Sequence, residues 1–490
     1  MAMATQLDPE GGYVDTGGVL IATPGVGGQA EAVHPTPDDS RADAHVSEVM
    51  SAALAEADLR VQVDVELSDL SVGAPGESGR GSGESEPVIV AQVPTPGDGL
   101  AQVVLLVDED GLLTWHGPTS GQPTGPGGTR GDDLMTYRIP LRSPADAGDG
   151  RGPVGWLGKK VLKVLVYRLL DDALARAGRY LASRWEEKHR WYGLRAISAS
   201  SGLAGEPVDW AAMTAGPALL FVHGTFSRGA TAFSGLPSEQ LRRLSDAYGG
   251  RVAVFDHPTV SVDPVTNARW FVEQFIADAP ADAELVVDVI AHSRGGLVAR
   301  ALAEQQDLLA LGGRRLEVRS AVFVGSPNAG TVLADAEHLG DLLDTYTNML
   351  DAFPDIGAVD VLQVVLEVVK QVATGMADGL DGLMSMNPGG DYLRALNKDP
   401  AERTGYAAIA ADFSPASRSP RQLAMNLVAD RLFRGANDLV VPRDGAWEVD
   451  DRSLVAADRR LSIADDDAVT HNSYFTNAAV QERLFELLRG

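Results

Sequence analysis

Runs of apolar residues, separated by segments of helical spacing, mark the second half of the chain. The runs fall at about residues 218–223, 251–255, 285–291, 319–325 and 405–411. Because they lack polar alternation and are rich in β-branched residues, they predict strands that are buried on both faces. Strands that alternate with helices form a mostly parallel sheet. We therefore predict an α/β fold over residues 216–490, with a mostly parallel sheet flanked by helices.

One interval in this half, residues 335–385, is long and helical in character. Residues 359–372 carry a broad apolar stripe, and several residues after them extend the apolar surface: Met376, Leu380, Leu383, Met384 and Met386. We predict a helical cap inserted in the α/β domain. Two interpretations stay open, because both need the same stripe. The cap is either a lid that lines an acyl pocket, or a packed helical excursion that never contacts substrate.

The first part of the chain follows other patterns. Residues 1–43 are rich in Gly, Pro, Asp and Ala and predict a disordered leader. Residues 44–57 have helical spacing, and residues 59–67 alternate strictly between polar and apolar. Further β-segments are predicted at 88–93, 101–115 and 137–141. Residues 44–142 are therefore predicted to form a small β-rich module, whose role and protein partner the sequence does not reveal.

Residues 150–215 are predicted to hold a long helix and a connector. The helical pattern runs from Val154 to Arg190, and four basic residues interrupt it: Lys159, Lys160, Lys163 and Arg168. A basic amphipathic helix is one way to bind a membrane surface. We favour the alternative, in which this helix packs on the α/β core or between domains.

Composition narrows the class of protein. The 490 residues carry 41 basic and 68 acidic side chains, a net charge of −27, which disfavours a nucleic-acid partner. There is no cysteine, so disulfides and thiolate metal sites are excluded. We find no secretory signal, no apolar window of the ~20 residues that an integral membrane helix needs, and no metal-binding spacing. The sequence predicts a cytoplasmic protein without metal or organic cofactor.

The strongest chemical signal is the segment Ala291-His-Ser-Arg-Gly-Gly296, between a predicted strand and a predicted helix. A serine in a sharp strand-to-helix turn is typical of a nucleophile elbow. Glycines fit such a crowded turn, and the helix N-terminus after it can stabilise an oxyanion. Ser293 is thus the candidate nucleophile, and the amide of Arg294 a candidate oxyanion donor. The alternative is an ordinary turn that happens to contain a serine.

A second segment supports this interpretation. The predicted strand at 218–223 ends in His223-Gly224, followed by Thr225 and Phe226. Such a loop bends back over the nucleophile in hydrolases with this elbow and supplies a second amide. We expect that donor to be Thr225 or Phe226. His223 itself is interpreted as a residue that packs locally, and Asp256 and His257 as residues that shape the rim of the site.

A serine nucleophile needs a base and an acid that orients the base. Only two histidines follow Ser293: His338, in a polar helical pattern, and His471, on a late loop. We choose His471 as the base. Asp438, on a turn before a short apolar run, is the preferred acid, while Asp465, Asp466 and Asp467 remain competitors in a charged run.

With these residues, the segment 216–490 resembles the lipase and esterase branch of the α/β-hydrolase superfamily. The resemblance rests on His223-Gly224, the elbow around Ser293, Asn437-Asp438 and His471-Asn472. Some bacterial lipases likewise carry alanine at the first elbow position. Residues 325–331 and 388–397 are similar to lipase segments, although asparagine and threonine replace a histidine and a serine in the first. The resemblance implies that Ser293 is the nucleophile, Asp438 the acid and His471 the base.

The resulting prediction is a serine hydrolase that cleaves carboxylic esters, with acyl-lipid or other hydrophobic esters as the hypothetical substrates. Two alternatives stay open. One is a thioesterase, amidase or acyltransferase, which the same three residues would serve. The other is a non-catalytic interaction protein on a hydrolase fold.

Overall fold

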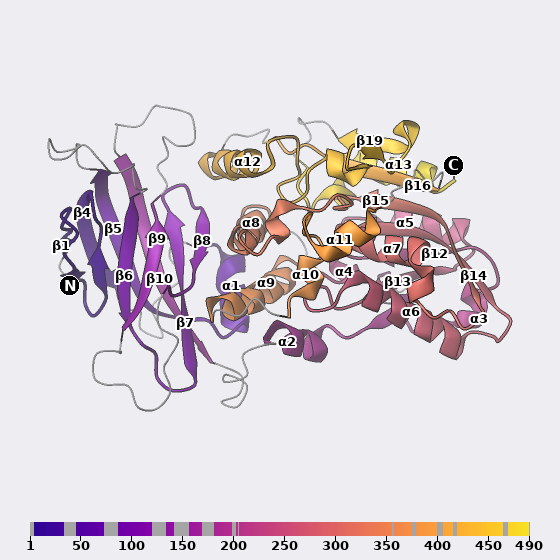
Figure 1. Ribbon diagram of the computed structural model, residues 1–490, viewed down its shortest axis with the longest axis horizontal. Helices are drawn as coiled ribbons and strands as arrows, with labels where there is room; N and C mark the ends of the chain where they lie inside the picture. Colours follow the sequence, from indigo (N-terminus) through magenta and orange to yellow (C-terminus); the bar gives the residue numbers. More distant parts are fainter. Residues whose placement is uncertain are drawn as a thin grey trace. The chain divides into compact units, whose positions relative to one another are not determined.

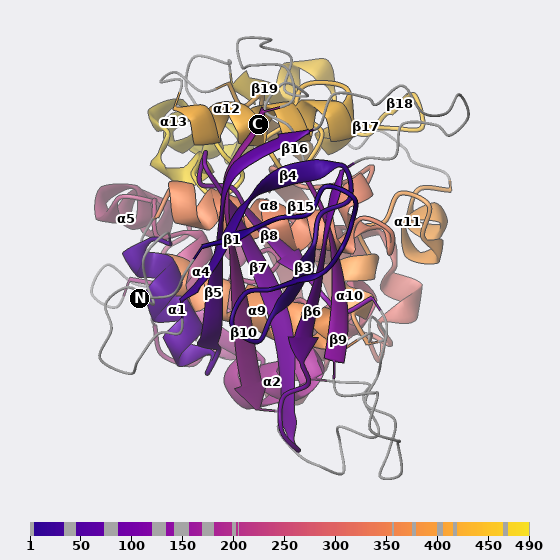
Figure 2. The same cartoon turned by 90° about the vertical axis from the view of Figure 1, so that its left-hand side faces the viewer.

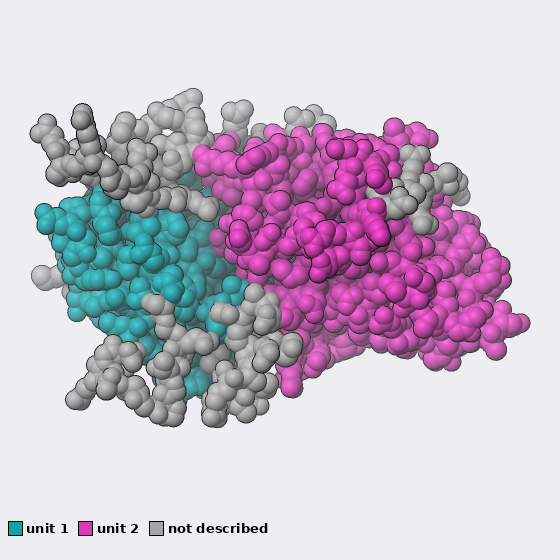
Figure 3. All heavy atoms as spheres, viewed as in Figure 1, with its two compact units in different colours: residues 1–181, 346–354, 362–377 teal, residues 182–345, 355–361, 378–490 magenta. Residues whose placement is uncertain are grey.

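The computed structural model describes most of the chain. Its described residues are 4–33, 46–72, 87–119, 134–141, 156–168, 181–197, 202–203, 205–354, 357–374, 379–398, 405–414, 419–463 and 469–489. They form two units, which Figure 3 distinguishes by colour: unit 1 comprises residues 1–181, 346–354 and 362–377, and unit 2 comprises residues 182–345, 355–361 and 378–490.

Unit 2 is built on a seven-stranded sheet of order β11-β13-β12-β14-β15-β16-β19. The strands are β11 (Gly193–Ala196), β12 (Ala218–Val222), β13 (Val252–Asp256), β14 (Glu284–His292), β15 (Arg315–Val324), β16 (Tyr406–Ala411) and β19 (Arg460–Ile463). Every neighbouring pair is parallel except β11 with β13. The five strands predicted from apolar runs are confirmed, and the short edge strands β11 and β19 were not predicted.

Both faces of this sheet are covered by helices, which explains the unbroken apolar runs. In β12, Leu220 and Val222 belong to one core and Leu219 and Phe221 to the other. The first core contains α3 (Trp210–Met213), α6 (Pro264–Asp278) and α7 (Gly295–Glu304), and the second contains α5 (Ser238–Ala247) and α13 (Ala478–Arg489). Figure 1 shows these helices along the parallel strands. Each strand residue therefore meets apolar side chains whichever way it points.

The remaining elements of unit 2 are short or connect the strands. They are most of α2 (Leu181–His189), α4 (Gly229–Ala232), α10 (Asp381–Met384), α11 (Asp391–Leu396), α12 (Pro420–Phe433), β17 (Glu448–Val449) and β18 (Arg452–Ser453). Within the described part of the chain, no helix is long and apolar enough to cross a membrane.

Unit 1 consists of two antiparallel sheets, most of whose strands are labelled in Figure 2. One has the order β1-β4-β5-β10-β7-β8 and the other β2-β3-β6-β9. The strands are β1 (Thr5–Gln6), β2 (Val14–Asp15), β3 (Leu20–Ala22), β4 (Val26–Val33), β5 (Arg60–Val72), β6 (Val88–Pro94), β7 (Leu100–Asp108), β8 (Leu113–His116), β9 (Leu134–Pro140) and β10 (Trp156–Arg168). Side chains from both sheets share one core, and α1 (Glu48–Glu56) precedes β5.

The prediction of a long helix from Val154 to Arg190 is wrong. Residues Trp156–Arg168 form β10, which lies between β5 and β7. Among the described residues of this range, 156–168 and 181–190, helix appears only in α2. Of the lysines that suggested a polar helical face, Lys159 is exposed, but Lys160 and Lys163 are buried in the sheet. The Nζ of Lys163 lies 2.7 Å from a carboxylate oxygen of Asp64. A central strand that hides its charges in ion pairs loses the polar alternation that would identify it.

The prediction of a disordered leader over 1–43 is also wrong for its described residues. Residues 5–33 contain β1 to β4, and β4 pairs with β5 from Val26↔Val72 to Val33↔Asp64. Glycine, proline and aspartate also favour tight turns between short strands, and the partner of β4 is distant in sequence. The β-rich unit thus extends beyond 44–142 at both ends, and residues 34–43 lie outside the described residues.

The helical character of 335–385 is confirmed by α8 (Leu339–Ala352), α9 (Ala358–Ala373) and α10. Residues 346–354 and 362–377 of this insertion belong to unit 1. There, the Asn348 side-chain amide exchanges two hydrogen bonds with the main chain of Leu113, at 2.8 and 2.7 Å. Tyr167 donates its hydroxyl to the carbonyl of Lys370 at 2.9 Å. The role of the insertion as a lid stays a prediction.

Candidate active site

Ser293 lies where β14 ends and α7 begins. Its φ of +54° is in the left-handed region, which non-glycine residues adopt mainly at strained sites. The two glycines after Arg294 are required by close packing: a Cβ on Gly295 would lie 2.3 Å from the Val222 carbonyl oxygen, and one on Gly296 2.4 Å from the Ser326 Oγ. The sharp turn expected from the sequence is therefore present, and it holds Ser293 at the carboxyl edge of the sheet.

The structure brings the three predicted side chains together. His471 Nε2 is 2.8 Å from Ser293 Oγ, and His471 Nδ1 is 2.8 Å from Asp438 Oδ2. All three residues are at most 2% exposed. The other candidate histidine, His338, is half-exposed and contacts Asp341 instead, and the competing acids 465–467 lie outside the described residues. Such a serine, imidazole and carboxylate series can transfer a proton from the hydroxyl to the imidazole.

The Asp438 carboxylate is saturated with donors. Oδ1 accepts the amides of Val440 and Val441 at 3.0 and 2.7 Å, while Oδ2 accepts His471 Nδ1–H and the Tyr474 hydroxyl, each at 2.8 Å. Burial alone would raise the pKa of Asp438, but the imidazole, the Val441 amide and the Tyr474 hydroxyl outweigh it and hold the pKa below its usual value. Asp438 therefore stays ionised and can orient His471.

Tyr474 is a residue of this site that the sequence did not assign. It is fully buried in the segment that follows His471, and its hydroxyl donates to Asp438 while accepting the amide of Ala411 at 2.9 Å. Burial and the Asp438 charge raise the pKa of Tyr474 well above its usual value, so the hydroxyl keeps its proton. The only local signal was an aromatic residue with a polar tip close to the candidate base.

Replacing Tyr474 with phenylalanine is expected to lower kcat by about tenfold and to leave KM unchanged, because the charged carboxylate loses one hydrogen bond. The matched control is Tyr248→Phe, which removes a 2.6 Å hydrogen bond to another buried carboxylate, Asp288, away from Ser293. Steady-state hydrolysis by the two variants provides the measurement. Equal kcat values for both variants and the wild type would contradict the assigned contact.

The loop after β12 offers fewer free backbone amides than the sequence suggested. Of the two donors predicted there, the Phe226 amide is already bound, donating to the Thr259 Oγ1 at 3.1 Å. The amides of Thr225 and Arg294 have no hydrogen-bond acceptor in the described residues. Gly224 allows close approach, since a Cβ there would lie 2.4 Å from the Ser293 Cβ. The two open amides are therefore those of Thr225 and Arg294, and Phe226 has to be removed from the predicted donors.

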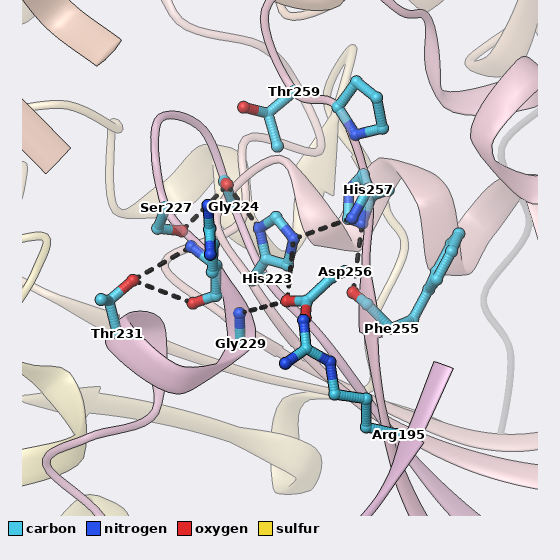
Figure 4. Close-up of polar contacts among 12 residues, drawn as sticks. Arg195, His223, Gly224, Ser227, Gly229, Thr231, Phe255, Asp256, His257 and Thr259 are labelled. Atoms are coloured by element: carbon cyan, nitrogen blue, oxygen red, sulfur yellow. Dashed lines mark hydrogen bonds and ion pairs between the residues drawn. The ribbon is translucent and has the colours of Figure 1, made fainter. Parts of the chain in front are cut away.

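A buried polar network supports this loop, as Figure 4 shows. His223 donates Nδ1–H to the Gly224 carbonyl at 3.0 Å, and its Nε2 accepts the His257 amide at 3.1 Å. The Asp256 carboxylate accepts the Gly229 amide at 2.8 Å and pairs with Arg195 at 2.8 Å. The side chains of His223, Asp256 and His257 are all buried. His223 packs locally, as expected, whereas Asp256 and His257 support the loop from the protein interior instead of shaping the rim of the site.

Two further residues hold neighbouring segments in place, and neither role has a local signal in the sequence. Glu186, buried in α2, accepts the amides of Thr259, Val260 and Ser261 at 2.7–2.9 Å. The Arg294 side chain is fully buried and donates to the carbonyls of Gly382 and Val262. Burial lowers the pKa of Arg294 to about 10, which leaves it charged at neutral pH. Glu186 thereby holds Thr259 in place, and the Thr259 hydroxyl accepts the Phe226 amide.

Three buried histidines around the site should make the folded protein less stable at acidic pH. Burial lowers the pKa of His223 to about 4 and that of His292 to about 3, and it lowers the pKa of His257 well below its usual value. In the unfolded chain these rings take up protons near pH ~6.5, whereas the folded rings stay neutral. The free energy of unfolding should therefore decrease as pH falls below ~6.5, until the folded rings titrate.

Thermal unfolding between about pH 7.5 and 5 measures this loss. His223→Gln should flatten the dependence of Tm on pH, because it removes one of the three protons taken up. A Tm independent of pH over this range would contradict the assigned neutral rings.

Comparison with known proteins places the chain in a family. The sheet and the site are those of an α/β protein whose candidate residues follow the carboxyl ends of parallel strands. A family model described as "Domain of unknown function (DUF7379)" matches residues 189–489, and the chain belongs to this family. A search of curated proteins finds no match.

Several solved structures are similar to part of this chain. The mature lipase BlEst2 of Bacillus licheniformis is 15% identical, with 61% of this chain and 98% of that chain covered and a TM-score of 0.33. Lipase 1 of Pelosinus fermentans is 14% identical over 55% and 98% of the two chains (TM-score 0.34), and the phospholipase PlaB of Legionella pneumophila is 17% identical over 47% and 44% (TM-score 0.31). TM-scores this low support no inference, so the conclusions below rest on the geometry of the site.

Proposed function

We propose that the protein is a serine hydrolase of the α/β-hydrolase type that cleaves carboxylic esters. The observation that carries this proposal is the contact series from Ser293 through His471 to Asp438, with 2.8 Å at each step. Two open amides, on Thr225 and Arg294, stand beside the serine as donors for an oxyanion. A nucleophile, a base, an orienting acid and an oxyanion site are the complete requirements of acyl transfer to water.

The proposed reaction has two halves. His471 takes the proton of Ser293 as the oxygen attacks the ester carbonyl, and the carbonyl oxygen becomes an anion held by the amides of Thr225 and Arg294. The C–O bond to the alcohol then breaks, and His471 gives its proton to the leaving oxygen. Water, activated by His471, attacks the acyl-enzyme, and the carboxylic acid leaves as Ser293 recovers its proton. None of these steps requires a metal or an organic cofactor.

Apolar surroundings support a hydrophobic acyl group. Leu380 and Leu383, near the end of the insertion, and Met386, just after it, are buried. The Met386 sulfur accepts the Thr225 hydroxyl at 3.7 Å. Ser293 is itself 2% exposed, so substrate entry requires movement of the residues that cover it. An acyl chain that displaces the apolar residues over Ser293 would replace their contacts with apolar contacts of its own. A short polar acyl group could not make these contacts, so it should be a poorer substrate.

Hydrolysis of p-nitrophenyl esters of increasing acyl length tests the substrate class. We expect kcat/KM to rise with chain length from acetate to octanoate, because each buried methylene stabilises the bound transition state. Equal or falling values would reject the hydrophobic ester as substrate. Activity on the matching acyl thioesters, or acyl transfer to an added alcohol in preference to water, would instead favour the thioesterase or acyltransferase alternative.

A further inference from the structure

Unit 2 contains a cavity at the edge of the sheet opposite to Ser293. Its volume is about 560 Å³, within the ~300–1,000 Å³ of small-molecule sites. Arg251 and Arg459 line it immediately before β13 and β19 begin, and Ser320 lines it from within β15. Ser293 and His223 instead follow the carboxyl ends of β14 and β12. The two sites are thus separated by the length of the strands.

The cavity concentrates positive charge in a strongly acidic protein. Of its three arginines, Arg319 is neutralised by the fully buried Asp288, which accepts its Nε–H at 2.9 Å. Arg251 donates Nε–H to the Pro217 carbonyl at 2.9 Å, and Arg459 donates to the carbonyls of Tyr406 and Leu487 at 2.9 and 2.7 Å. Neither of these two forms an ion pair with a carboxylate of the described chain.

The carbonyl contacts hold both guanidinium groups in place and leave donors free. Arg251 has both Nη groups, and Arg459 its Nη1, without an acceptor in the described part of the chain. Gly249 makes room for Arg251, since a Cβ there would lie 2.9 Å from its Nη1. Guanidinium groups fixed in this way lose little side-chain entropy when they bind an anion.

An unsatisfied hydroxyl is an independent sign of a ligand. Ser320 lines the cavity, is only 6% exposed, and its Oγ has no hydrogen-bond partner among the described residues. A buried polar atom without a partner is costly, and such atoms in native proteins usually meet a water or a ligand. Phe485 and Leu488 of α13 also line the cavity and supply apolar surface.

We propose that this cavity binds a phosphate monoester that carries an apolar group. The two unpaired guanidinium charges of Arg251 and Arg459 match the charge of about −1.5 to −2 on a phosphate monoester near neutral pH. A carboxylate would leave one of the two charges unbalanced. The Ser320 hydroxyl donates to a phosphate oxygen, and the apolar group of the ester packs on Phe485 and Leu488.

Titration calorimetry on the full chain, with phenyl phosphate, inorganic phosphate and benzoate as probes, tests this proposal. Phenyl phosphate should bind about tenfold more tightly than inorganic phosphate, because only its ring can pack on Phe485 and Leu488. It should also bind about tenfold more tightly than benzoate, which has a single charge. Arg251→Gln and Arg459→Gln should each weaken binding of phenyl phosphate by about tenfold.

Arg315→Gln is the matched control, because Arg315 is an exposed arginine of β15 that pairs with Glu284. It should leave binding unchanged, and Arg251→Lys, which keeps the charge, should retain more affinity than Arg251→Gln. No binding at millimolar phenyl phosphate, or equal affinity of the wild type and the two glutamine variants, would overturn the proposal. Since binding is read directly, such a result leaves the proposed ester hydrolysis at Ser293 untouched.

Discussion

Ser293→Ala is expected to reduce ester hydrolysis by about 10⁶-fold, the largest effect of any single substitution in this protein. Alanine removes the hydroxyl oxygen that His471 Nε2 contacts and that would attack the ester, so no acyl-enzyme can form. The positive φ of this residue is also accepted by alanine at similar cost, so the turn should persist. Single-turnover and steady-state rates with a p-nitrophenyl ester measure the loss.

The matched control for this variant is Ser51→Ala, which removes another hydroxyl with a buried oxygen, in α1 of unit 1. It should retain wild-type hydrolysis. Residual activity of Ser293→Ala within tenfold of the wild type would mean that another residue is the nucleophile.

Asp438→Asn is expected to lower kcat by about 10⁴-fold while the protein stays folded. The asparagine amide cannot accept the His471 Nδ1–H as the carboxylate does, and it favours the imidazole tautomer that carries its proton on Nε2. That tautomer cannot take the proton of Ser293. The kcat of the variant, measured beside its Tm, separates this effect from unfolding.

The rival acids provide the comparison for this substitution. A variant with Asp465, Asp466 and Asp467 all replaced by asparagine should keep full activity, since Asp438 already fills the contact with His471. If that triple variant lost activity and Asp438→Asn kept it, the assignment of the acid would be overturned.

The sequence predicted unit 2 better than unit 1, for a physical reason. Strands such as β12 are apolar along their whole length because helices cover both faces, and this pattern is visible locally. In β10, by contrast, Lys163 is buried beside Asp64, which lies 99 positions away. A lysine at such a position looks like the polar face of a helix until its partner is known. Local patterns therefore missed the strand.

The candidate site likewise contains residues that local patterns reveal and residues that depend on distant partners. Ser293, Asp438 and His471 were found because their chemistry requires a chain order and a turn that short motifs reveal. That the Phe226 amide is already occupied depends on Thr259, which Glu186 holds from a helix 73 residues earlier in the chain. Tyr474 donates its hydroxyl to Asp438 because the segment after His471 folds back against the Asp438 turn. Contacts of this kind become visible only when the folded chain brings distant segments together.

Labelling with a fluorophosphonate probe, followed by mass spectrometry of the peptide that carries the adduct, tests the central claim most directly. The probe forms a covalent bond only with an activated hydroxyl, so it reads the nucleophile and its base without knowledge of the substrate. We predict a single adduct on Ser293 in the wild type, and none in Ser293→Ala or His471→Ala. An adduct on another residue, or a folded wild-type protein that stays unlabelled, would contradict the account.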